Sequence, residues 1–189
     1  MRKYIEGDIN LSKHFLTELP DFLSEVAVRG NFYLQHNQLT SLKGSPLSVT
    51  GSFLCNKNKL DSLLHAPRTV GENFYCDENK KLETLEGGPV SVGGDYSCSL
   101  NENLVSLKGC PKSVFLTFFC NGNRRLQSLV GGPKYVEGSF SCSNNKNLET
   151  LEGAPKYVDG NFIWKNNKGK FTEEEIRAVC EIKGWVYLK

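Results

Sequence analysis

The stretch "VGENFYCDEN" (residues 70–79) places a valine, an aromatic residue, a cysteine and an asparagine at fixed spacing, and the chain repeats this phrase. Close copies are "VGGDYSCSLN" (residues 92–101) and "VEGSFSCSNN" (residues 136–145). The aromatic position recurs after 21 residues twice and then after 22 residues four times. It is occupied by Phe32, Phe53, Phe74, Tyr96, Phe118, Phe140 and Phe162. A fixed period in this range predicts a solenoid, in which each repeat stacks on the next.

Three other columns keep the same register. Valine stands four residues before each aromatic residue, and asparagine stands five residues after it. The position two residues after the aromatic is cysteine in five repeats, namely Cys55, Cys76, Cys98, Cys120 and Cys142. Side chains alternate along a strand, so the valine, aromatic and cysteine columns are predicted to face one core, with leucines filling it from the other side. A glycine column, where Glu72 and Leu116 are exceptions, is predicted to share that inner side.

Both ends of the chain continue the pattern. The segments 5–14 and 182–188 are further copies of the strand phrase. Before the last copy, "FTEEEIRAVCEI" (residues 171–182) contains Thr172 and Glu175 at capping-box spacing. This segment predicts a helix that covers the open end of the core, with an inner face formed by Ile176, Val179 and Cys180.

These segments predict one solenoid domain over residues 1–189. Residues 1–27 are expected to form the N-terminal cap and first strand, and residues 28–169 the repeats. Residues 170–189 are expected to form the C-terminal cap.

The stretch Phe53-x-Cys55-x-x-Asn58-x-Leu60-x-x-Leu63 resembles the short bacterial type of leucine-rich repeat, L-x-L-x-x-N-x-L-x-x-L. Phenylalanine and cysteine replace the strand leucines, and most copies carry one extra residue before the next leucine. The resemblance implies a horseshoe with a parallel β-sheet on its concave face and a mostly irregular convex side. The closing segment also resembles the tail of leucine-rich proteins of tailed bacteriophages. That resemblance implies a phage-encoded inhibitor that binds and blocks a host protein, such as a defence factor.

Composition gives no global argument for a nucleic-acid or membrane partner, because the formal net charge is only +2. The N-terminal sequence lacks the apolar core of a secretion signal, and no window approaches the roughly 18 apolar residues of a membrane span. We therefore expect a cytoplasmic protein, in the host cytoplasm if the gene is carried by a phage. The seven cysteines are an odd number, which disfavours a disulfide framework.

The cysteine and asparagine columns are interpreted as structural. Buried thiols behave as small apolar groups, and a ladder of parallel sulfurs does not converge on a metal. The asparagine amides are expected to satisfy backbone groups at the bends. The three histidines fall on different phases of the repeat, and no phosphate-binding glycine motif follows a strand. We therefore expect neither an enzyme nor a bound cofactor or metal.

Function is expected in positions that the repeat does not dictate. Between the aromatic and cysteine columns lies an outward column that differs from repeat to repeat. Exposed aromatic residues beside polar ones are typical of protein-binding hot spots. The residues predicted to bind a protein partner are Tyr33, Leu54, Tyr75, Phe115, Phe119, Ile163 and Trp185.

A second candidate surface is basic. Lysines and arginines recur in the turns beside the asparagines, namely Lys57, Lys59, Lys80, Lys81, Arg124, Arg125, Lys146 and Lys168. They are expected to line one edge of the solenoid. This edge could bind nucleic acid or an acidic protein surface, or it could serve only to keep the protein soluble. A structural component of a larger assembly is the third alternative for the whole chain.

Overall fold

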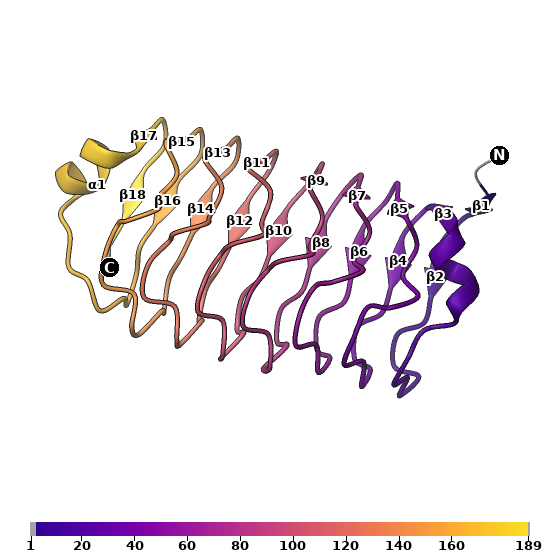
Figure 1. The fold of residues 1–189 in the computed structure, drawn as a ribbon. Coiled ribbons are helices and arrows are strands. Elements are labelled where there is room, and N and C mark those ends of the chain that lie inside the picture. Colours follow the sequence, from indigo (N-terminus) through magenta and orange to yellow (C-terminus); the bar gives the residue numbers. More distant parts are fainter. Residues whose placement is uncertain (1–2, 189) are drawn as a thin grey trace.

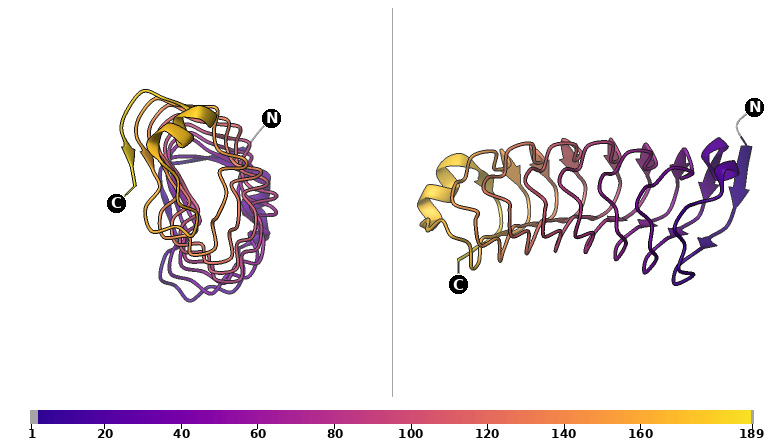
Figure 2. Two further views of the ribbon diagram at one scale, coloured as in Figure 1. Left: turned by 90° about the vertical axis from the view of Figure 1, so that its left-hand side faces the viewer. Right: turned by 60° about the horizontal axis from the view of Figure 1, so that its bottom comes forward.

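The computed structural model describes residues 3–188 and shows a parallel β-solenoid. The coils lie side by side in an elongated row, with the N-terminus at one end and the C-terminus at the other (Figure 1). Viewed along the row, successive coils superimpose with a gradual rotation (Figure 2). Strand pairing places Phe53 opposite Phe74, as the period predicts. The predicted domain limits at residues 1 and 189 fall outside the described residues.

Each strand phrase forms two short strands, so that every coil contributes to two sheets within residues 3–188. The second strands form one nine-stranded parallel sheet. In spatial order it contains β18 (Val186–Tyr187), β16 (Phe162–Ile163), β14 (Phe140–Ser141), β12 (Phe118–Phe119), β10 (Tyr96–Ser97), β8 (Phe74–Tyr75), β6 (Phe53–Leu54), β4 (Phe32–Tyr33) and β2 (Ile9–Asn10).

The first strands form a second layer that is split into two sheets. The five-stranded sheet contains β1 (Lys3–Glu6), β3 (Val26–Arg29), β5 (Ser48–Val49), β7 (Thr69–Val70) and β9 (Ser91–Val92). The four-stranded sheet contains β11 (Ser113–Val114), β13 (Tyr135–Val136), β15 (Tyr157–Val158) and β17 (Glu181–Ile182).

The bend between the two strands lies at the glycine column, where backbones of neighbouring coils come very close. A Cβ atom on Gly51 would lie 2.8 Å from the Gly30 carbonyl oxygen, which explains why glycine is preferred here. The prediction that this column faces the core is wrong. The chain turns at this point, and the side chains of Glu72 and Leu116 are exposed to solvent.

The split between β9 and β11 coincides with the loss of two glycines. Phe115 and Leu116 stand where the preceding coil has Gly93 and Gly94. A Cβ atom on Gly93 would lie 2.1 Å from the Gly71 carbonyl oxygen. Other coils carry one side chain in this pair of positions, at Thr50, Glu72, Glu137 or Asp159, whereas the coil of β11 carries two. The first-strand ladder is interrupted at this coil, while the nine-stranded sheet continues.

The core is a stack of like residues, as the columns predict. The seven rings of the aromatic column are fully buried, and neighbouring centroids lie 5.1 to 5.8 Å apart. Aromatic pairs in such geometry stabilise by about 0.5–1.5 kcal/mol beyond the burial of their area. The valine, cysteine and leucine columns complete the core around these rings.

The asparagine column forms the predicted spine. From Asn79 to Asn145, each backbone N–H donates to the side-chain oxygen of the next asparagine, at 2.6 to 2.9 Å. The amide group of Asn145 also donates to the carbonyl oxygens of Cys120 and Cys142. One side chain therefore satisfies backbone groups of two coils, which explains why no other residue type occupies this column in the repeats.

Each end of the row carries a short helix. At the N-terminal end, η1 (Asp21–Glu25) buries Leu23. At the C-terminal end, α1 (Glu173–Val179) begins with the predicted capping box of Thr172 and Glu175. Ile176 and Cys180 are buried as predicted, but Val179 is 43% exposed, so its assignment to the inner face is wrong.

Arg177 of α1 completes the C-terminal end of the first-strand layer. Inside the row, the N–H groups of Lys183 and Gly184 donate to the carbonyl oxygens of Val158 and Gly160 in the preceding coil. On the outer side of this last coil, the Arg177 guanidinium donates to the carbonyl oxygens of Ile182 and Gly184, at 2.6 and 2.9 Å. The guanidinium thus supplies the two donors that a further coil would have provided.

Candidate partner-binding face

A stripe of large side chains runs along the outer face of the nine-stranded sheet. The outer stripe consists of Tyr33, Leu54, Tyr75, Phe119, Ile163 and Tyr187. Each follows a more buried neighbour on the same strand, which is fully buried except for Val186 before Tyr187, so each points away from the core. All are half-buried except Tyr187, which is 41% exposed. None of them is needed to fill the space between the aromatic and leucine columns.

Two serines interrupt the stripe on either side of Phe119. Ser97 and Ser141 occupy the same column as the stripe but are almost fully buried. The stripe therefore consists of one run from Tyr33 to Tyr75 and a second part around Phe119 and Ile163. Short residues beside Phe119 leave more of its ring edge uncovered than a row of large residues would.

A polar ladder that the sequence interpretation missed borders the stripe on the side of the bend. Except at Thr117, the oxygen of each side chain accepts the backbone N–H of the equivalent residue in the next coil. Asn31 accepts from Ser52, Asn73 accepts from Asp95, and Asp95 accepts from Thr117, each at 2.8 Å. The signal was present, because every position of this column before Trp185 is Asn, Asp, Ser or Thr.

A second polar ladder borders the other side of the stripe. Asp77 accepts hydrogen bonds from the Ser97 hydroxyl and from the Ser99 N–H. Two coils further on, Asn121 accepts from the Ser141 hydroxyl and the Ser143 N–H, at 2.8 and 2.7 Å. Burial raises the pKa of Asp77, and the two hydrogen bonds oppose that shift. These bonds hold the buried serines in place and give the stripe a rigid polar border.

Two of the predicted partner-binding residues lie outside the stripe. Phe115 directly follows β11, in the first-strand layer, and is 51% exposed beside the interrupted ladder. Trp185 directly precedes β18 at the bend and is 72% exposed. The remaining five, from Tyr33 to Ile163, are brought together on one face.

Acidic residues of neighbouring coils neutralise part of the predicted basic edge. Lys57 lies 3.5 Å from Glu78, and Lys80 lies 3.3 Å from Glu102. Lys168 lies 2.5 Å from Glu149. The side chain of Arg125 contacts only the amide oxygen of Asn103, at 3.5 Å, and Lys81, Arg124 and Lys146 are exposed. The edge is thus a mixed surface whose most basic part is the Arg124–Arg125 pair.

The cysteines are buried free thiols. Cys76, Cys98 and Cys142 each donate to a backbone carbonyl of the next coil, at 3.4 to 3.6 Å between sulfur and oxygen. Burial raises the pKa of the thiols along the column, and raises that of Cys110 and of Cys180 to about 12. Such thiols are poor nucleophiles because they stay protonated.

Residues 3–188 offer neither of two other kinds of site. No group of three or more His, Cys, Asp and Glu side chains is placed to hold a metal ion there. Nor does that part of the chain contain a helix with the length and apolar character needed to span a bilayer.

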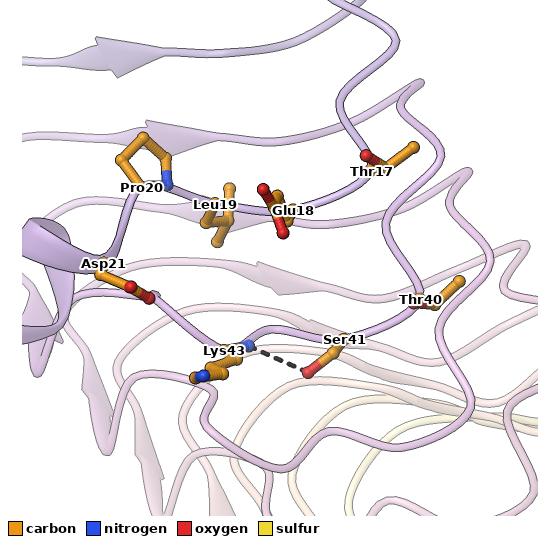
Figure 3. Close-up of a pocket in the computed structure, with 8 residues that line it drawn as sticks. All are labelled: Thr17, Glu18, Leu19, Pro20, Asp21, Thr40, Ser41 and Lys43. Atoms are coloured by element: carbon orange, nitrogen blue, oxygen red, sulfur yellow. Dashed lines mark hydrogen bonds between the residues drawn. The ribbon is translucent and has the colours of Figure 1, made fainter.

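A hollow of about 420 Å³ lies at the N-terminal end, between the segments 17–21 and 40–43 (Figure 3). It is lined by Glu18, Asp21 and Lys43 together with threonine, serine, leucine and proline side chains. The hydrogen bond drawn there joins the Lys43 N–H to the Ser41 hydroxyl, at 3.1 Å. The lining contains neither histidine nor cysteine.

The sequence matches no protein-family model, and comparisons with curated proteins and with solved structures gave no match.

Proposed function

We propose that this chain is a leucine-rich-repeat type of solenoid that acts as a protein-binding module through the outer stripe. The observation that carries the proposal is the placement of the six large side chains of the outer stripe on one face, where they do not help to fill the core. Half-buried aromatic and aliphatic side chains have little entropy left to lose on binding. They also present apolar surface that contacts water in the free protein and is removed from water on binding.

The two polar ladders support the same proposal. Hydrogen-bonding groups beside the stripe are already paired with backbone of the next coil, so a partner need not satisfy most of them. An apolar centre with a polar border matches the anatomy of protein interfaces. A horseshoe curvature with the stripe on its concave side, as in leucine-rich repeats, would increase the contact with a convex partner.

The identity of the partner rests on the resemblance of the C-terminal segment to phage leucine-rich proteins. We propose a host protein, such as a defence factor, whose activity is blocked when the solenoid covers it. The basic edge is the alternative surface, and the Arg124–Arg125 pair is the observation that favours it for an acidic or nucleic-acid partner.

The test replaces Tyr33, Leu54, Tyr75 and Phe119 by serine, the residue that this column already uses at Ser97 and Ser141. Each replacement should change the free energy of unfolding by about 1 kcal/mol or less, because these side chains lie outside the core. Loss of a hot-spot side chain typically costs about 2 kcal/mol of binding or more, which is about 30-fold in Kd. The quadruple variant should therefore stay folded and lose its partner.

The partner is first captured with the parent protein from lysate of the producing or host cell, and its Kd is then measured with purified components. The matched control replaces Lys80, Lys81, Arg124 and Arg125 by serine, which should mainly slow association and flatten its salt dependence. Normal binding by the stripe variant, together with loss of binding by the basic-edge variant, would refute the proposal. In that case, a steep fall of affinity with salt would assign binding to the basic edge.

A further inference from the structure

A column of lysines runs along the four-stranded sheet of β11 to β17 (Figure 1). Lys112, Lys134 and Lys156 directly precede β11, β13 and β15, one in each of three consecutive coils. The N–H of Lys134 donates to the carbonyl oxygen of Lys112 at 2.7 Å, and that of Lys156 to the carbonyl oxygen of Lys134 at 2.8 Å. We name these three residues the lysine ladder. Neighbouring strands lie about 4.8 Å apart, so the lysine ladder spans about 10 Å.

The charge of the lysine ladder is not paired within residues 3–188. None of its three members forms a salt bridge in that part of the chain, whereas Lys108 pairs with Glu86 of the preceding coil at 2.7 Å. Along the strands of the ladder, the next acidic residues are Glu137 and Asp159, three positions further on, which is about 10 Å in extended chain. Like charges on adjacent rungs repel each other, so a contribution to stability does not explain the ladder.

Two tyrosines stand beside the lysine ladder. Tyr135 and Tyr157 each follow one of its lysines and precede a buried valine, so their rings lie on the outer face of the strands. The hydroxyl of Tyr157 donates to the Asp159 carboxylate at 2.6 Å. Tyr135 is 55% exposed, and Ser113, which precedes it in the column, is too small to cover its ring. The Tyr135 ring is therefore an open aromatic surface next to the unpaired lysines.

The lysine ladder has a definite length. On the N-terminal side, the next residue of the column is Val90, and the break between β9 and β11 separates it from Lys112. On the C-terminal side, the equivalent position is the buried Cys180 at the end of α1, and the adjoining Glu181 pairs with Lys183 at 2.6 Å. The uncompensated positive charge is thus confined to three rungs of one sheet.

We propose that the lysine ladder and Tyr135 bind a single-stranded nucleic acid. Its phosphates lie along the three lysines, and one base stacks on the Tyr135 ring. Proteins that bind single strands without sequence preference combine a row of positive charge with aromatic side chains in this way. The surface lies on the first-strand layer, so it is separate from the outer stripe and from the basic edge.

Charge spacing favours a nucleic acid over an acidic peptide. A stacked strand carries one phosphate per about 3.4 Å of its axis, so about three phosphates lie opposite a ladder of about 10 Å. An extended peptide turns only every second side chain to one face, which spaces its carboxylates by about 6.6 Å. Fewer of its charges would meet the three lysines, and it would leave the Tyr135 ring without a stacking partner.

The experiment measures the fluorescence anisotropy of a fluorescein-labelled thymidylate dodecamer that is titrated with the full chain over a range of KCl concentrations. We expect saturable binding whose logarithmic association constant falls with log[KCl] with a slope of about −2, because three contacted phosphates contribute about −0.7 each. Lys134→Gln should weaken binding and make this slope shallower by about 0.7. Tyr135→Ala should weaken binding about five-fold or more and leave the slope unchanged, because stacking does not release counterions.

Three controls separate this site from the others. Replacing both Arg124 and Arg125 of the basic edge by serine should leave dodecamer binding unchanged, and so should the quadruple serine variant of the outer stripe. Lys134→Gln should have a Tm no lower than that of the parent chain, because it removes repulsion between neighbouring lysines. Capped hexaglutamate should compete weakly with the dodecamer.

Four results would overturn the proposal. The first is no saturable binding at about 50 mM KCl, where phosphate contacts are strong. The second is normal binding by Lys134→Gln together with loss of binding by the Arg124 and Arg125 variant. The third is unchanged affinity in Tyr135→Ala. The fourth is competition by hexaglutamate as strong as that by unlabelled dodecamer, which would make an acidic segment the ligand instead.

Discussion

Replacing Tyr96 by phenylalanine is expected to stabilise the protein. Tyr96 is the only tyrosine in the aromatic column and its ring is fully buried between Phe74 and Phe118, at centroid distances of 5.1 and 5.4 Å. Its hydroxyl oxygen has no hydrogen-bond partner among the described residues. Folding therefore removes this hydroxyl from water without compensation.

The magnitude follows from that lost hydration. Burial of an unsatisfied polar group costs about 1–3 kcal/mol, and removing the hydroxyl recovers most of this cost. The ring contacts persist in phenylalanine, and the space left by one oxygen atom subtracts a part of the gain. We expect the free energy of unfolding to rise by about 1–2 kcal/mol, and Tm by roughly 2–8 °C for a chain of this size.

The assay is urea unfolding followed by tryptophan fluorescence and by far-ultraviolet circular dichroism, so that non-coincident transitions reveal stepwise unfolding of the array. The converse variant, Phe74→Tyr, inserts a hydroxyl one coil away and should lower stability by about 1–3 kcal/mol. If Tyr96→Phe is less stable than the parent protein, the hydroxyl has a partner such as a buried water, and the reasoning is refuted.

Two further outcomes concern the spine and the thiols. Asn123→Ala removes the hydrogen bonds that the Asn101 N–H and the Cys120 carbonyl make to this side chain, at 2.8 and 2.9 Å. It should lower the free energy of unfolding in urea by about 2–6 kcal/mol. Replacement of the exposed Asn147 by alanine should leave that free energy almost unchanged. The buried thiols should resist alkylation in the native state at pH 8 and react after unfolding, and rapid native labelling would contradict their burial. Because their pKa is raised in the folded state, the unfolded chain loses its thiol protons first as pH rises above about 8.5. Stability should therefore be complete below that pH and fall by about 1.4 kcal/mol per pH unit and thiol above it, and Cys120→Ala should reduce this slope by one thiol's share.

The sequence predicts the solenoid and its columns because the determinants of each are local and repeated. One period places the rings, thiols and asparagines in register, and the capping box alone locates the start of α1 at Thr172. The bend at the glycine column was not foreseen. It depends on how closely Gly51 approaches Gly30 in the neighbouring coil, which alternation within one strand does not reveal.

The candidate site was predicted in part for the same reason. Outward alternation identifies Tyr33, Leu54 and Tyr75, but it also suggested Phe115, which the bend places in the other layer. The polar ladders that border the stripe depend on pairs about 22 residues apart, such as Asn73 and Asp95. Their residue types were visible in the column, but the backbone groups that they satisfy become evident only when the coils are stacked.

The interruption beside Phe115 affects where the row of coils can bend. One layer of strands runs unbroken from β2 to β18, while the other is cut between β9 and β11. The row should bend most easily between β9 and β11, because no strand-to-strand hydrogen bonds join the two coils in that layer. The break follows β9, which lies in the same coil as Ser97 of β10, where the outer stripe is also divided. We expect the angle between the two halves of the stripe to change more easily at this break than elsewhere along the first-strand layer.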